Sequence, residues 1–175
     1  MEATNGSQTG LKRTISVVVE NKFGVLARIA TLFAARGFNI DSLAVGETED
    51  PAVSRMTIVA SGSEAVLEQV EKQLNKLIDV IKVQNYEGQP HIERDLALIK
   101  VKVDKSTRSE IFQIVDIFRA RVVDVGADSL IIEITGGEEK IEAIETLLRP
   151  FGIKEMVRTG IIAMARGARK RDGEK

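Results

Sequence analysis

The sequence of 175 residues contains no cysteine, no tryptophan and a single histidine, His91. Without cysteine, the chain has no disulfide, no thiolate metal site and no cysteine nucleophile. A Ser-His-Asp triad would have to use His91, and no nucleophile-elbow motif lies near it. We therefore expect no catalytic residue, no metal site and no cofactor bound by this chain.

An excess of charge of either sign is also missing. The chain has 25 Lys and Arg against 26 Asp and Glu, a net charge of −1, which gives no electrostatic reason for binding nucleic acid or an anionic membrane. An RNA-recognition module would need aromatic residues on its central strands, and the expected third strand, Ser54–Val59, has none.

Long hydrophobic runs are absent as well. No apolar run approaches the roughly 18–20 residues that a membrane helix needs. Residues Met1–Gly10 are polar and contain no basic residue, which is unlike a signal or transit peptide. We expect a cytoplasmic protein with a disordered N-terminal tail over residues 1–12 and a charged C-terminal tail over residues 166–175.

Short β-branched runs alternate with amphipathic stretches along the first half of the chain. Strands are predicted at 14–20, 39–46, 54–60 and 80–83. One helix is predicted after Gly24, ending near Gly37, and another after Ser63, which can cap it. The order βαββαβ is the split βαβ, or ferredoxin-like, unit of the α+β class. Its residues are 13–84, and the polar stretch 85–94 that follows is predicted to be a linker.

The same order returns after that linker, over residues 95–165. Strands are predicted at 96–103, 121–125, 129–134 and 153–157, with a continuation at 161–164. The capping-box spacing of Thr107 and Glu110 predicts the start of one helix, and Pro150 ends the other. The chain is therefore an internal duplication, two tandem ferredoxin-like units. Because an open β-branched sheet edge is a template for pairing with another subunit, we expect a homodimer or a larger assembly.

The turn after the first strand is the best candidate for a binding site. It leads into a helix N-terminus, where unpaired N–H groups and the helix dipole favour an anion. Gly24 allows close approach of a ligand, and Asn21 carries an amide that can both donate and accept hydrogen bonds. Asn39 is expected to point at the same spot. The pattern suits a small zwitterion with an apolar side chain, although Gly24 as a plain turn residue also explains it. The remaining candidates form the turn or an apolar wall: Phe23, Val25, Leu26 and Ile40.

The second unit and the acidic loop provide contrasts. The turn Asp104–Thr107 has no glycine, and Arg121 stands where Asn39 would be, so an anion pocket is not expected there. The carboxylates of Glu47–Asp50 lie in a polar loop without histidine, and a solvated surface is the expected arrangement rather than a metal site.

Several long strings resemble one family. Residues 14–29 resemble the opening of an ACT domain, a ferredoxin-like domain that binds amino acids. Further strings at 33–46, 54–58, 71–77, 93–100 and 158–161 look like the regulatory small subunits of acetohydroxyacid synthase, also called acetolactate synthase. The resemblance runs from about Lys12 to Gly167.

The resemblance implies a function without catalysis. The first unit would be an ACT domain that dimerises and holds valine, the branched-chain end product, at the dimer interface, with effector residues Asn21, Gly24, Val25, Leu26, Asn39 and Ile40, and Phe23 in the same turn. The second unit would contact the catalytic large subunit. That subunit would carry thiamine diphosphate, a divalent metal and FAD, and would form acetolactate.

Two other functions are compatible with the residues. One is a stand-alone ACT-type amino-acid sensor or scaffold whose partner is a different enzyme or a regulator. The other is a small enzyme, which the single histidine and the lack of cysteine disfavour.

Overall fold

The computed structural model describes residues 11–167. The chain divides into two compact units, with the boundary between Pro90 and His91. Most of the two predicted tails (1–12 and 166–175) lies outside the described residues.

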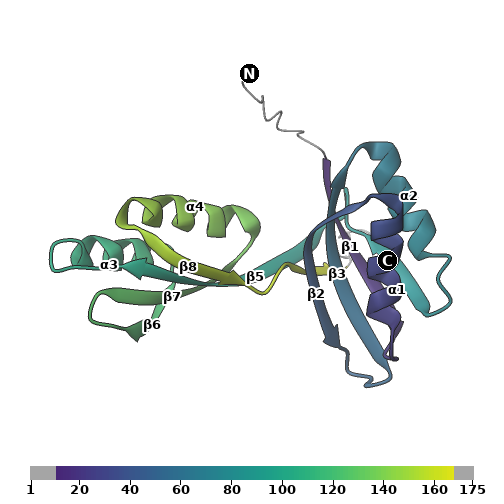
Figure 1. The fold of residues 1–175 in the computed structure, drawn as a ribbon, viewed down its shortest axis with the longest axis horizontal. Coiled ribbons are helices and arrows are strands. Elements are labelled where there is room, and N and C mark those ends of the chain that lie inside the picture. Colours follow the sequence, from purple (N-terminus) through teal and green to yellow (C-terminus); the bar gives the residue numbers. More distant parts are fainter. Residues whose placement is uncertain (1–10, 168–175) are drawn as a thin grey trace, which may run out of the picture. The chain divides into compact units, whose positions relative to one another are not determined.

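The first unit has the order βαββαβ, as predicted. Its elements are β1 (Leu11–Glu20), α1 (Val25–Arg36), β2 (Asn39–Glu47), β3 (Val53–Gly62), α2 (Glu64–Leu74) and β4 (Val80–Asn85). The sheet is antiparallel with the strand order β2-β3-β1-β4. Both helices cover the same face of the sheet, and β2 and β4 form its two edges (Figure 1).

The core of this unit lies between the sheet and the two helices. Alternate residues of β1 (Ile15, Val17 and Val19) are buried, as the two-residue period of a strand requires. α1 buries Val25, Ile29 and Phe33, which follow one another at the helical spacing of four residues. Each fully buried Val, Ile or Phe side chain contributes about 1.5–3 kcal/mol, so this layer accounts for much of the stability of the unit.

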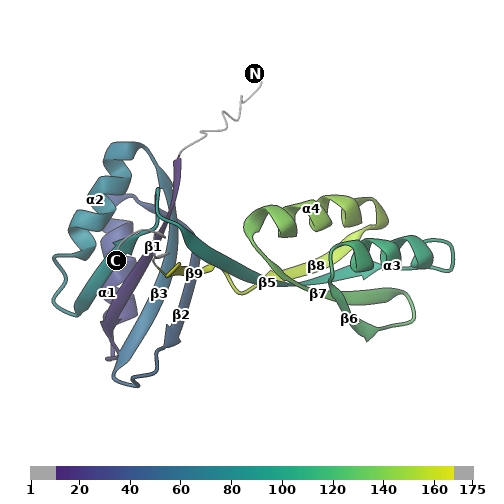
Figure 2. The ribbon, with the colours of Figure 1, turned by 180° about the vertical axis from the view of Figure 1, so that it is seen from behind.

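The second unit repeats the architecture. Its elements are β5 (His91–Lys102), α3 (Arg108–Ile117), β6 (Arg121–Val125), β7 (Ser129–Gly136), α4 (Glu138–Leu148), a 3-10 turn (Arg149–Phe151), β8 (Ile153–Arg158) and β9 (Ile162–Ala165). The strand order β6-β7-β5-β8 repeats that of the first sheet. Figure 2 shows α3 and α4 on one face of this sheet. The fold is therefore α+β, with two tandem ferredoxin-like units.

β5 is longer than predicted, and its two halves pair with different strands. Its second half pairs with β7 and β8, whereas residues His91–Arg94 pair with β9. The predicted linker 85–94 thus contributes its last residues to a strand. Where the two pairings meet, the buried carboxylate of Asp95 accepts hydrogen bonds from Arg158 Nε at 2.6 Å and Thr159 Oγ1 at 3.0 Å. These bonds join β5 to the last residue of β8 and to the turn that follows it.

The two predicted helix caps have different outcomes. Ser63 caps α2 as predicted, because its Oγ accepts a hydrogen bond from the Val66 N–H at 3.4 Å. The spacing at Thr107 predicts the start of α3 correctly, since Thr107 is its N-cap residue, but the Thr107 side chain makes no capping hydrogen bond. Its hydroxyl instead accepts from the N–H of Asp104 at 3.1 Å, and the Asp104 carboxylate accepts from the N–H of Thr107 at 2.9 Å.

Within residues 11–167, none of the helices combines the length and the apolar character that crossing a bilayer would require.

Candidate site at the start of the first helix

The turn between β1 and α1 leaves the start of the helix open. Gly24 is the N-cap residue, with φ 84° and ψ −6° in the left-handed region, and no side chain caps the helix. A side chain at Gly24 would have no other atom within 4 Å of its Cβ. The N–H groups of Leu26 and Ala27 reach no acceptor within residues 11–167. Unpaired N–H groups at the positive end of a helix are suited to bind an anion.

Asn21 stands beside this helix start, and its amide group is already oriented. Its Nδ2 donates to Glu47 Oε1 at 3.1 Å and to the carbonyl oxygen of Pro51 at 2.9 Å. The backbone N–H of Asn21 also donates to the carbonyl oxygen of Ala52 at 2.7 Å. Both side-chain N–H donors are thus used to hold the β2–β3 loop, and the acceptor Oδ1 is left for a ligand.

The predicted apolar wall is only partly present. Leu26 is 45% exposed and Phe23 is fully exposed, so both side chains border the open turn. Val25 does not, because its side chain is 4% exposed and packs in the core of the first unit. The backbone of Val25 also makes a bond of its own, from its N–H to the carbonyl oxygen of Lys22 at 3.4 Å.

Asn39 and Ile40 lie at the far end of the sheet from Gly24 within one chain. Asn39 pairs with Ser61 near the end of β3, whereas Asn21 meets the residues just before the start of β3. A strand of 10 residues such as β3 is about 33 Å long. The prediction that Asn39 points at the same spot as Asn21 is therefore wrong for a single chain. The Asn39 side chain instead donates to Asp41, and Ile40 packs partly buried against the core.

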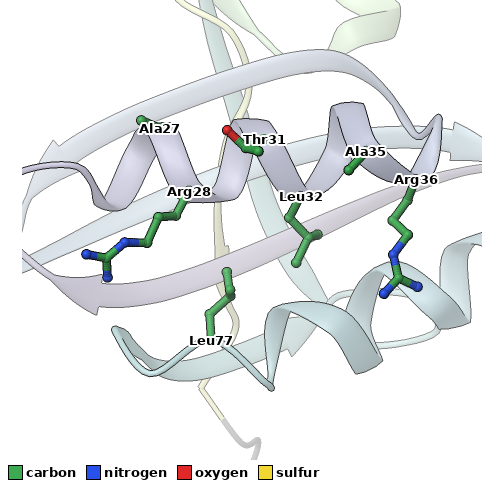
Figure 3. A pocket seen from close by; sticks show the side chains of 7 residues that line it. All are labelled: Ala27, Arg28, Thr31, Leu32, Ala35, Arg36 and Leu77. Carbon is green, nitrogen blue, oxygen red and sulfur yellow. The ribbon is translucent and has the colours of Figure 1, made fainter.

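A groove that the sequence did not reveal lies between α1 and the end of α2 (Figure 3). It is open, with a volume of about 460 Å³, and its lining is mostly apolar, formed by Ala27, Arg28, Thr31, Leu32, Ala35, Arg36 and Leu77. Arg28 forms an ion pair with Asp79, and Arg36 Nη2 donates to Gln73 Oε1 at 3.1 Å. The sequence feature that indicates this groove is the four-residue spacing of Ala27, Thr31 and Ala35, which places small residues on one face of α1. No carboxylate lines the groove, so it lacks a partner for an ammonium group.

The corresponding turn of the second unit is filled by its own carboxylate. The Ser106 hydroxyl, the Ser106 N–H and the Thr107 N–H donate to Asp104 Oδ1 at 2.6, 2.8 and 2.9 Å. The hydrogen bonds from the Ser106 side chain and from these backbone groups lower the pKa of Asp104 to about 2. The turn before α3 is therefore occupied by a carboxylate of its own, in agreement with the expectation that it forms no anion pocket.

Other groups of chemical interest have structural contacts. His91 Nε2 lies 3.0 Å from Glu93 Oε1 on the same strand. No set of three or more His, Asp or Glu side chains is arranged to hold a metal ion in the described part of the chain.

Comparisons with known proteins match both units. Residues 15–82 match the family model for the "AHAS small subunit-like ACT domain", and residues 94–167 match that for the "Small subunit of acetolactate synthase". The chain is 52% identical over 166 residues to the acetolactate synthase small subunit of Mycolicibacterium smegmatis, covering 95% of this chain and 96% of that one. It is 55% identical over 156 residues to the small subunit of Aquifex aeolicus, covering 89% and 81%.

A solved structure agrees with these matches. The crystal structure of the acetolactate synthase small subunit from Thermotoga maritima superposes with a TM-score of 0.81 at 45% sequence identity. The superposition covers 90% of this chain and 99% of that chain. The likeness therefore extends over both units.

Proposed function

Because this chain belongs to the family of acetolactate synthase small subunits, we propose that it activates a catalytic large subunit and makes it sensitive to valine. The chain itself is the regulatory subunit. We place thiamine diphosphate, a divalent metal and FAD in the large subunit, together with the condensation of pyruvate into acetolactate.

The open start of α1 supports the assignment of the effector site. The valine carboxylate would accept hydrogen bonds from the free N–H groups of Leu26 and Ala27, next to Gly24. The valine ammonium would donate to Oδ1 of Asn21, whose Nδ2 is already bonded elsewhere. The exposed side chain of Leu26 would contact the isopropyl group. The observation that carries this proposal is the uncapped, glycine-opened helix start.

A second copy of the chain would complete the site. β2 lies at the edge of its sheet and, among the described strands, pairs only with β3. Antiparallel pairing of two β2 strands about Leu43 would bring Asn39 of one chain opposite Glu47 of the other, close to Asn21. Asn39 and Ile40, which are remote from Gly24 within one chain, would then reach the effector of the second chain. This geometry favours a homodimer formed by sheet extension.

Valine inhibits only if it binds the inhibited arrangement of the complex more tightly than the active one. A coupling of roughly 1–3 kcal/mol, about 5–150-fold in affinity, is typical of such regulation. We assign contact with the large subunit to the second unit, whose turn before α3 carries the Asp104 carboxylate, an unfavourable neighbour for an anionic ligand.

Calorimetric titration of valine into the wild-type chain and into Gly24→Asp tests the effector site. We expect binding to the wild-type chain and at least a 100-fold loss in the variant, because the added carboxylate repels that of valine. Gly24→Asn is the matched control, since asparagine has the same size and tolerates a left-handed backbone. It should retain more affinity than the aspartate variant. Unchanged affinity of Gly24→Asp would refute the site.

The partner is tested separately. We expect the chain to co-purify with the large subunit and to raise its acetolactate formation, and Gly24→Asp to raise it equally but without inhibition by valine. Co-purification with a different enzyme instead would favour a stand-alone sensor.

A further inference from the structure

The last residue of β2 carries a carboxylate next to the proposed effector site. Glu47 Oε1 lies 3.1 Å from Nδ2 of Asn21, and Glu47 pairs with Ser54 at the start of β3. The sequence pattern placed Glu47 in the acidic loop after the second strand, whereas it is the last residue of β2. The contact with Asn21 brings this charge to the open end of α1.

The hydrogen bonds of Asn21 determine which of its atoms faces a ligand. A reversed amide would direct Oδ1 at both the Glu47 carboxylate and the Pro51 carbonyl oxygen, so the observed orientation is the one that the acceptors require. Oδ1 receives no hydrogen bond from the described residues. It can accept from an ammonium but cannot donate to a carboxylate. Asn21 and Glu47 together therefore present acceptors only.

Glu47 differs from the other carboxylates of the loop. Asp50 Oδ1 accepts a hydrogen bond from the Ala52 N–H at 2.9 Å and so stabilises the β2–β3 loop. Glu49 is exposed, and neither a hydrogen bond nor an ion pair engages it in the described structure. The loop is held by further bonds, including that from the Thr48 N–H to the carbonyl oxygen of Val53 at 3.0 Å. Among the carboxylates of this loop, Glu47 is thus the one that contacts Asn21.

We propose that Glu47 is a specificity-determining residue that pairs with the effector ammonium. It would select α-amino acids over carboxylates of the same shape that lack the amino group, including the corresponding 2-oxo acids. This inference rests on the proposed effector site. For an amino acid, the Glu47 carboxylate adds a charge-assisted hydrogen bond. For a ligand without the ammonium, the same carboxylate leaves only repulsion toward the ligand carboxylate.

Binding of three ligands to the full chain tests the role of Glu47. The ligands are valine, isovalerate, which lacks the amino group, and isobutylamine, which lacks the carboxylate. Each is titrated by calorimetry, with the weaker ligands measured by competition against valine. Glu47→Gln removes the charge but keeps the size, and Glu49→Gln is the matched control two residues away.

We expect Glu47→Gln to bind valine and isobutylamine about tenfold more weakly than the wild-type chain, the order of magnitude of a hydrogen bond to a charged group. Its affinity for isovalerate should stay unchanged or rise. Glu49→Gln should match the wild-type chain for all three ligands. Circular dichroism checks that both variants are folded.

Three results would overturn the inference. Equal valine affinity of Glu47→Gln and Glu49→Gln would show that Glu47 makes no contact with the effector. An equal loss for valine and isovalerate would show that Glu47 only positions Asn21. Both of these leave the proposed function standing. Absence of valine binding by the wild-type chain would instead refute the effector site itself, and the role of Glu47 with it.

Discussion

The two units share one fold but use the start of their first helix differently. In the second unit, the Asp104 carboxylate accepts hydrogen bonds from the backbone N–H groups of Ser106 and Thr107, in the turn that precedes α3. In the first unit, Gly24 stands at the start of α1 and no side chain caps the helix. A helix start has the same electrostatic requirement in both cases. In the second unit a carboxylate occupies the turn before the helix, whereas the turn of the first unit holds a glycine and no acidic side chain.

The contrast between the turns before α1 and α3 results from a few residue differences. Asn21 and Asp104 hold comparable positions after the first strand of each unit, yet one presents an amide that bonds to the neighbouring loop and the other a carboxylate that bonds to its own turn. The duplicated units therefore share a fold but place different chemical groups in the turn before the first helix.

Exchanging the two turns should have the largest effect. Replacement of Asn21-Lys22-Phe23-Gly24 by Asp-Lys-Ser-Thr, the sequence of residues 104–107, places a carboxylate in the turn before α1 and removes its glycine. We expect valine affinity to fall by at least 100-fold, because the new charge repels the effector carboxylate and the added side chain at position 24 hinders its approach. Calorimetry measures the loss.

The reverse exchange is the control for this prediction. Installing Asn-Lys-Phe-Gly at residues 104–107 should leave valine binding by the first unit unchanged. It should not create a second site, because Arg121 occupies the position that corresponds to Asn39. Valine binding that survives the first exchange would contradict the comparison of the two units.

The hydrogen-bonded Asp104 carboxylate should also make the stability of the second unit depend on pH. The turn before α1 has no acidic residue that could do the same. The pKa of Asp104 is lowered from 3.8 to about 2 in the folded chain. A lowered pKa means that the stabilisation is complete above pH 4 and is lost as the pH falls from about 4 to about 2. We expect Asp104→Asn to lower the urea midpoint at pH 6 and to resemble the wild-type chain near pH 2. A difference that is the same at both pH values would contradict this assignment.

The order of strands and helices could be predicted because the apolar pattern changes its period along the chain. The alternation in β1 and the four-residue spacing of Val25, Ile29 and Phe33 are local signals, and both follow from burial on one face. The same burial explains why Val25 was wrongly assigned to the ligand wall. Its position on the apolar face of α1 places its side chain in the core.

The arrangement of the site was less predictable, because it depends on strand direction and on contacts between remote residues. Asn39 follows α1 closely in sequence but lies at the opposite end of the sheet, since the helix carries the chain back along its length. The bond between Asn21 and Glu47 links residues 26 positions apart. The spacing of Thr107 and Glu110 located the start of α3, but the hydrogen bonds between Thr107 and Asp104 depend on the geometry of the turn, which the spacing does not specify.

The ends of the first helices give the smallest difference between the units. Both α1 and α3 are followed by a residue in the left-handed region, Gly37 at φ 66° and Arg119 at φ 51°. Their backbone bonds correspond: the N–H of Gly37 donates to the carbonyl oxygen of Ala34 at 3.2 Å, and that of Arg119 to Asp116 at 3.0 Å. Glycine adopts this conformation without the steric penalty that a Cβ introduces.

Exchanging the residue type at these two ends should therefore shift stability in opposite directions. Gly37→Ala should destabilise the first unit by about 1 kcal/mol through the backbone alone, because no atom lies within 4 Å of the added Cβ. Arg119→Gly should stabilise the second unit by only about 0.5 kcal/mol, since the relief of strain is partly offset by the greater freedom of glycine in the unfolded chain. Urea unfolding of the full chain measures both. A loss of stability in Arg119→Gly would mean that the arginine side chain makes a contact worth more than the strain of its backbone.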